Sequence, residues 1–127
     1  MHWDANGPGC AGAILMSGVY GNNYKNAMPN QIAYFGKPSV KYAEMAVLGN
    51  VDFGETPIML STAEYDPIVW VKFSIKLLLE IGSKFDWLPR YKQMLGHNHV
   101  SQVYSIGSGD NGIGPDIIDF IQQILSR

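Results

Sequence analysis

The sequence predicts an α/β protein built on about three parallel strands with flanking helices. The main observation is an uninterrupted apolar run at 58–60, which is typical of a strand buried on both faces. A long apolar helix is expected over 67–81, and a further short strand over 90–95. Because strands and helices alternate along the chain, the strands should be parallel and joined by right-handed crossovers.

An earlier strand is expected within 11–18, centred on the apolar residues 13–16. The stretch 19–55 has a different character, since short helical pieces at 29–35 and 39–48 alternate with glycines. Their apolar residues are scattered and form no continuous stripe. We interpret this stretch as a small lid-like excursion over the rim of the sheet.

Two long helices should flank the sheet. The helix over 67–81 is expected to end at Gly82 and has only one narrow polar stripe, so most of its circumference should be covered. The closing helix over 115–125 has an apolar face with a helical period. Its residues are Ile117, Ile118, Ile121, Ile124 and Leu125.

The composition indicates one domain over 1–127 and excludes several classes of partner. Hydrophobic residues make up 46% of the chain and charged residues 16%, against roughly 25% charged in an ordinary soluble domain. Such a composition suggests that part of the surface is covered in a larger assembly. A net charge of −2 gives no electrostatic case for binding nucleic acid or an anionic membrane.

The same composition favours a cytoplasmic protein. A single cysteine, Cys10, forms no internal disulfide, which fits a reducing compartment. The first residues have no basic and apolar leader pattern, and the apolar stretch at 11–16 is far too short to span a bilayer.

Asp66 and His99 are the candidate catalytic residues, and each follows one of the expected strands. Asp66 lies just past the 58–60 run, and His99 lies in Gly96-His97-Asn98-His99 after the 90–95 strand. Because α/β proteins gather ligands at the carboxyl ends of their strands, we expect the two side chains to meet there. A buried carboxylate that accepts the histidine Nδ1 proton fixes the tautomer and stabilises the imidazolium formed in acyl transfer.

Three segments together resemble a known family. AGAILMSGVYG, TPIMLSTAEYDP and GHNHVS, in this order and before an amphipathic helix, are similar to the carboxyl-terminal part of an α/β-hydrolase of the esterase and lipase kind. By this resemblance, which covers nearly the whole chain, Asp66 matches the triad acid and His99 the triad base. It implies a partial α/β-hydrolase fold, a carboxylic-ester hydrolase activity on a small-molecule ester, and no cofactor or metal.

The family pattern also requires a nucleophile that this sequence lacks. The family places its serine in a Gly-x-Ser-x-Gly turn. Ser17 lies in Leu-Met-Ser-Gly-Val, and Ser108 lies in a late loop. We therefore expect the serine and the oxyanion segment to precede Met1 and the isolated chain to be inactive. The strand within 11–18 would then have an open edge, which implies a homo-oligomer or a complex with a chain that supplies the amino-terminal half.

Other interpretations compete with the catalytic one. Asp66 before Pro67 is a good N-cap for the helix that follows. His99 is a candidate for an exposed turn histidine, and His97 for a structural or exposed one. The two histidines are also candidate metal ligands together with His2. Cys10 without an adjacent base is expected to be a small buried hydrophobe, and aromatic residues such as Tyr20 either pack the core or line an acyl pocket.

At the level of function, the alternative is a non-catalytic binding or assembly module on a truncated hydrolase fold. A complete flavodoxin-like domain is a third possibility. It is disfavoured because no phosphate-binding loop follows the first strand, and the glycine-rich loop at 107–114 lacks the Lys-Ser/Thr ending of a phosphate cradle.

Overall fold

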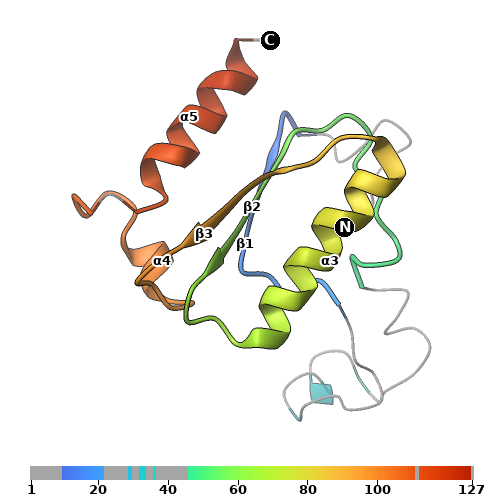
Figure 1. Cartoon of the computed structure of the whole chain (residues 1–127), viewed down its shortest axis with the longest axis horizontal. Helices are drawn as coiled ribbons and strands as arrows, with labels where there is room; N and C mark the ends of the chain where they lie inside the picture. The colour runs from blue at the N-terminus through green and yellow to red at the C-terminus, as the bar shows by residue number, and fades with distance from the viewer. Residues whose placement is uncertain are drawn as a thin grey trace.

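The computed structural model describes residues 10–21, 29, 32, 33, 36, 46–110 and 112–126. The elements in this part of the chain form a small sheet with helices on both sides (Figure 1). They are β1 (Ala13–Met16), β2 (Ile58–Ala63), α3 (Ile68–Phe85), β3 (Arg90–Met94), α4 (Ser101–Tyr104) and α5 (Gly114–Leu125).

The three strands are parallel, as predicted, and β2 lies between β1 and β3. Met59 of β2 is paired with Ile14 of β1 and with Arg90 of β3, which sets the register of the whole sheet. All six residues of β2 are buried. The apolar run at 58–60 therefore marks the central strand, because a strand covered on both faces needs no polar alternation.

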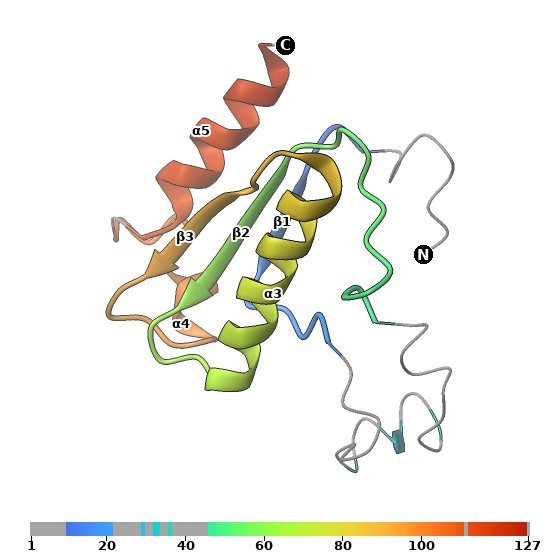
Figure 2. The ribbon, with the colours of Figure 1, turned by 45° about the vertical axis from the view of Figure 1, so that its right-hand side comes forward.

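The sheet separates two apolar clusters. On one face, Ile58 and Leu60 of β2 pack in a cluster with Leu77 and Ile81 of α3. On the other face, Met59 packs in a cluster with residues that include Phe120 of α5. Successive strand residues point to opposite faces, so one strand supplies both clusters. Figure 2 shows α3 and α5 on opposite sides of the sheet.

The helix α3 is longer than expected and does not end at Gly82. It runs from Ile68 to Phe85 and ends at Asp86, whose φ of 59° is left-handed. A Cβ on Gly82 would lie 2.7 Å from Leu88 Cδ2. The glycine therefore allows the chain after the helix to pack back closely, and the expected end at this residue is wrong.

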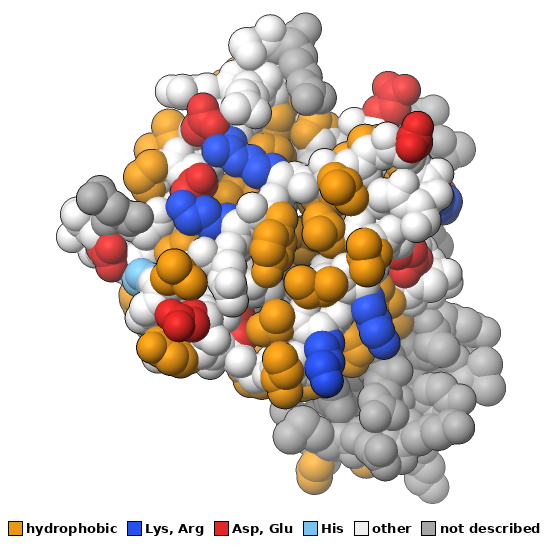
Figure 3. Space-filling model, in the orientation of Figure 1, with side chains coloured by type: hydrophobic (Ala, Val, Ile, Leu, Met, Phe, Trp, Pro, Cys, Tyr) orange, Lys and Arg blue, Asp and Glu red, His pale blue; other side chains and the backbone are white. Residues whose placement is uncertain are grey.

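The composition of α3 predicted that most of its circumference is covered, but its outer side is exposed. Four apolar side chains on it are between 39% and 67% exposed, namely Ile68, Val69, Ile75 and Leu79. In Figure 3, hydrophobic side chains gather along this helix with basic side chains beside them. The face left open by the sheet is thus available for contact with something else.

The closing helix α5 has two apolar sides. Phe120 is buried, with Ile117 and Ile124 beside it, and these side chains contact the sheet. In contrast, Ile118, Ile121 and Leu125 are 58%, 44% and 78% exposed. The expected single face is therefore split, because the sheet covers only one side of the helix.

Three charge pairs connect α5 to β3, and one of them joins Arg90 to Asp116 at 3.5 Å. Arg90 contacts Asp119 at 2.5 Å, and Lys92 contacts Asp116 at 2.5 Å. Both cations stand on β3 and both carboxylates on α5, so the pairs orient the helix across the strand.

Most of the expected excursion, including 39–45, lies outside the described residues. Within the described part, Pro29, Ile32 and Ala33 are helical. Val51 and Phe53 belong to the buried core beside α3, being 2% and 4% exposed. Among the helices in the described ranges, none is long and apolar enough to cross a membrane.

Candidate active site

Asp66 and His99 are in contact, as predicted from their places after β2 and β3. The Nδ1 atom of His99 lies 3.2 Å from Oδ1 of Asp66. The Asp66 side chain is fully buried, whereas the His99 side chain is 46% exposed. The two residues meet because β2 and β3 are neighbours in a parallel sheet, so their carboxyl ends lie at the same rim.

The second carboxylate oxygen of Asp66 is held by two donors. Its Oδ2 accepts the backbone N–H of Ala63 at 2.6 Å and the hydroxyl of Ser17 at 2.5 Å. Hydrogen bonds to an ionised carboxylate are short and strong, so these donors fix the side chain. The N-cap interpretation of Asp66 is wrong: the N-cap of α3 is Pro67, without a side-chain capping bond.

Ser17 is buried at the carboxyl end of β1, being 1% exposed. Its φ of 44° lies in the left-handed region. Besides donating to Asp66, its Oγ lies 2.5 Å from Nε2 of Gln102 in α4. The same Nε2 lies 3.3 Å from the carbonyl oxygen of His99. Ser17 thus contacts the acid of the pair and not the base.

Trp70, in the first turn of α3, packs against the imidazole of His99. The two ring centroids are 4.4 Å apart, and the ring planes are tilted by 59°. Contacts of this tilted kind restrict the orientation of a ring. His99 is therefore held at Nδ1 by Asp66 and along its side by the indole.

His97 is held in a different place. Its Nδ1 lies 3.3 Å from Oγ of Ser101, and its Nε2 lies 3.6 Å from Oδ2 of Asp110. The side chain is only 14% exposed, which agrees with a structural role. His2 falls outside the described residues, and in the described part no three metal-ligating side chains come together.

The serines do not complete a triad within the described ranges. Ser17 is committed to Asp66, and Ser108 donates to the carbonyl oxygen of Ser105 at 2.9 Å. Within those ranges, no serine hydroxyl is hydrogen-bonded to the imidazole of His99. The expectation that neither Ser17 nor Ser108 is the nucleophile agrees with these contacts.

Tyr20 is a core residue close to the acid. It is 6% exposed, and its hydroxyl accepts the N–H of Gly18 at 3.1 Å. The pKa of Tyr20 is raised to about 12, chiefly by burial. The hydrogen bond from Gly18 opposes this shift, and the negative charge of Asp66 adds to it. A Cβ at Gly18 would lie 2.4 Å from the tyrosine ring, so the ring packs directly on the backbone. Cys10, expected to be buried, is exposed.

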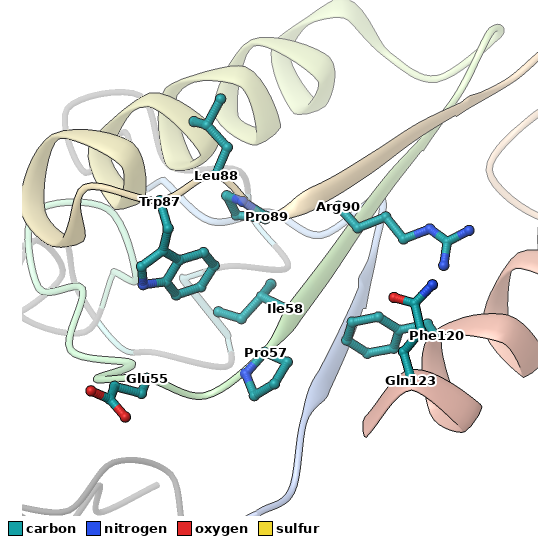
Figure 4. A pocket seen from close by; sticks show the side chains of 9 residues that line it. All are labelled: Glu55, Pro57, Ile58, Trp87, Leu88, Pro89, Arg90, Phe120 and Gln123. Atoms are coloured by element: carbon teal, nitrogen blue, oxygen red, sulfur yellow. The ribbon is translucent and has the colours of Figure 1, made fainter. Parts of the chain in front are cut away.

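A hollow in the described part lies at the opposite end of the sheet from this pair. It measures about 650 Å³ and has Trp87 on one side and Phe120 on the other (Figure 4). Pro57 and Arg90, which flank the starts of β2 and β3, also line it. The guanidinium of Arg90 is already paired with Asp119. This hollow therefore has no part in the chemistry of Asp66 and His99.

Ser17, Gln102 and Trp70 are the residues of the site that sequence reasoning missed. From the sequence, Ser17 is a rejected candidate for the nucleophile, and Trp70 is one residue of an apolar helix. The Ser-Gly step after the first strand is a usable signal for Ser17. Gln102 gives no signal, because its partner Ser17 stands 85 positions away along the chain.

Comparison with known families and proteins adds no assignment. No family model matches this chain, and no curated protein matches it either. The fold and the contact describe a small parallel α/β sheet with a carboxylate–histidine pair at its carboxyl rim.

Proposed function

We propose that this chain carries the acid and the base of a carboxylic-ester hydrolase site. His99 is the general base and Asp66 is the residue that orients it. The observation that supports the proposal is the 3.2 Å contact between a buried carboxylate and a half-exposed imidazole. A catalytic base needs such an arrangement, since one ring nitrogen is fixed inside while the ring still reaches solvent and substrate.

The chemistry follows from the hydrogen-bond pattern. With the Nδ1–H of His99 hydrogen-bonded to Asp66, Nε2 of His99 is the basic nitrogen. It takes the proton of a serine hydroxyl as the serine oxygen attacks the ester carbonyl, and it then returns that proton to the departing alcohol. Water repeats the two steps and releases the acid. Asp66 stabilises the imidazolium throughout and does not itself take the proton.

The proposed nucleophile stands on a strand beside β1. Ala13 N–H donates to the Pro57 carbonyl at 2.9 Å, and Ser17 N–H donates to the Ser61 carbonyl at 2.8 Å. In a parallel ladder this spacing leaves the backbone groups of Ile14 and Met16 on the open side. A parallel strand added there ends at the same rim as Asp66 and His99. We assign it to a segment or chain with a Gly-x-Ser-x-Gly turn.

A non-catalytic assembly module is the second candidate function. It is favoured by the exposed apolar residues on the outer sides of α3 and α5 together with the outer edge of β1, which no strand of the described part covers. In this case the contact between Asp66 and His99 only stabilises the loop after β3. The two candidates differ in one outcome. The hydrolase requires a serine whose reactivity depends on His99, and the assembly module does not.

The test is fluorophosphonate labelling of the protein as isolated from its natural source with everything that remains bound. We expect one serine, within a Gly-x-Ser-x-Gly turn, to be labelled, and we expect His99→Ala to abolish the labelling. His97→Ala is the matched control, because the imidazole of His97 contacts Ser101 and Asp110 instead of Asp66. It should leave labelling intact.

Two results would contradict the proposal: no serine is labelled, or labelling is the same in the His99→Ala protein. Thermal unfolding of both variants checks that they are folded. Reading the gene for an in-frame Gly-x-Ser-x-Gly ahead of Met1 then shows whether the serine belongs to the same polypeptide or to another one.

A further inference from the structure

Four residues at the rim form a closed ring of contacts, in which three links join side chains and one reaches a backbone carbonyl. Oδ1 of Asp66 meets Nδ1 of His99, and Oδ2 of Asp66 accepts the hydroxyl of Ser17. Oγ of Ser17 meets Nε2 of Gln102, which in turn reaches the carbonyl oxygen of His99. The ring therefore links the end of β1, the end of β2 and the loop after β3.

The direction of each hydrogen bond follows from the chemistry of the groups. An ionised carboxylate only accepts, so the Ser17 hydroxyl donates its single proton to Asp66. The Ser17 oxygen then has only lone pairs to offer Gln102, and the His99 carbonyl also accepts. The amide nitrogen of Gln102 therefore faces both, because a rotated amide would set its oxygen against two acceptors.

The inner part of this ring is buried. Gln102 has no exposed surface, and Ser17 is 1% exposed. In the described part, Oε1 of Gln102 is buried without a hydrogen-bond partner. Leaving a buried polar atom unpaired costs about 1–3 kcal/mol, so a shape-matched apolar side chain would avoid that cost. The amide nitrogen of Gln102 is the group that the site uses.

The backbone of Ser17 supports the same conclusion. A left-handed φ in a residue with a Cβ costs roughly 1–2 kcal/mol, whereas glycine adopts it freely. Serine at φ 44° is therefore energetically less favourable than glycine in the turn after β1. What serine offers and glycine lacks is the hydroxyl between Asp66 and Gln102.

We infer that Ser17 and Gln102 are positioning residues for the pair, an inference whose catalytic meaning rests on the proposed function. Ser17 and Ala63 saturate Oδ2 of Asp66, which leaves Oδ1 turned toward His99. Gln102 holds the His99 backbone to the same ring. Together they keep the imidazole proton on Nδ1 and leave Nε2 as the basic nitrogen.

The test is the tautomer of neutral His99, read from its two ring ¹⁵N chemical shifts in the whole chain at a pH where the ring is uncharged. We expect the Nδ1–H form, the minor tautomer of free histidine, to predominate. Ser17→Gly and Gln102→Leu should move the population toward the Nε2–H form. Ser17→Gly is the cleaner variant, since glycine suits the local φ and the fold should persist.

Ser108→Gly is the matched control, because its hydroxyl contacts the Ser105 carbonyl at 2.9 Å and not the ring. It should leave the tautomer unchanged. An unchanged tautomer in folded Ser17→Gly would overturn the inference. The outcome is independent of fluorophosphonate labelling, so a tautomer shift without a labelled serine would refute the hydrolase proposal and leave the positioning role standing.

Discussion

The indole of Trp70 and the imidazole of His99 are packed at 4.4 Å between ring centroids. The contact brings the start of α3 against the loop after β3. Trp70 is only partly buried, so it shields the imidazole without closing it off from solvent.

Truncating Trp70 should loosen His99. We expect Trp70→Ala to reduce the free energy of unfolding by about 2 kcal/mol in urea, less than a fully buried tryptophan would lose. The His99 ring protons should shift and broaden in NMR spectra. Trp70→Phe, which keeps an aromatic face, should retain most of the contact. Unchanged His99 resonances in Trp70→Ala would show that the indole does not position the ring.

Tyr20 should make the fold sensitive to alkali. In the unfolded chain its hydroxyl ionises near pH 10, while burial in the native protein raises its pKa to about 12. Between these values the unfolded state loses a proton that the folded state keeps. The free energy of unfolding therefore falls as pH rises through this window, by about 2 kcal/mol from this residue.

The measurement is urea unfolding at several pH values between about 9 and 12, a range that includes the pKa values of the unfolded and the folded state. Tyr20→Phe should give a flatter dependence on pH than the wild-type chain, whatever its offset in stability. Tyr104→Phe is the control, since Tyr104 is 79% exposed and should leave the slope unchanged. Equal slopes in all three proteins would rule out the effect.

The isolated chain should hydrolyse short-chain aryl esters no faster than its His99→Ala variant. The reason is that Ser17 is buried and bonded to Asp66, so it cannot act on a substrate. Removing the nucleophile from a triad leaves only residual catalysis. A product burst that depends on His99, with covalent labelling of Ser17 or Ser108, would contradict this expectation.

The edge of β1 should be covered in solution. Light scattering of the purified chain should give a mass above the 14.0 kDa of one copy, whether from a homo-oligomer or from a bound chain. The amides of Ile14 and Met16 should be protected from hydrogen exchange by the new partner. Ile14→Pro should weaken the assembly, because it removes an outward N–H and spares the bonds to β2.

A 14.0 kDa monomer at high concentration, with the Ile14 and Met16 amides exchanging freely, would refute this prediction. Leu15→Pro is the contrasting variant. Its N–H lies on the β2 side of the strand, so the change should destabilise the fold itself as well as the assembly.

The central sheet and the contact between Asp66 and His99 were predictable from local patterns. The 58–60 run identifies a strand buried on both faces, and this property needs no knowledge of its neighbours. The contact between Asp66 and His99 follows once their strands are taken to be adjacent and parallel. Both inferences depend on residues whose environment is indicated by their immediate neighbours in the sequence.

The features that sequence reasoning missed depend on partners distant along the chain. Gly82 looks like a helix end, and only the position of Leu88 shows that it is a packing site. The apolar residues of α5 look like one face, and only the sheet decides which are buried. Gln102 becomes part of the site because α4 lies beside the end of β1, a relationship set by topology and by no local motif.

The most direct measurement is the ester hydrolysis rate of the natural assembly with Asp66→Asn. An asparagine keeps the shape of the side chain but has only one acceptor oxygen. If that oxygen accepts the hydrogen bonds from Ala63 and Ser17, the amide nitrogen faces Nδ1 of His99 and cannot accept its proton. His99 would then carry its proton on the wrong nitrogen. The proposal predicts a fall in kcat of about 10⁴-fold with the fold intact. A folded Asp66→Asn assembly with the kcat of the unmodified protein would contradict it.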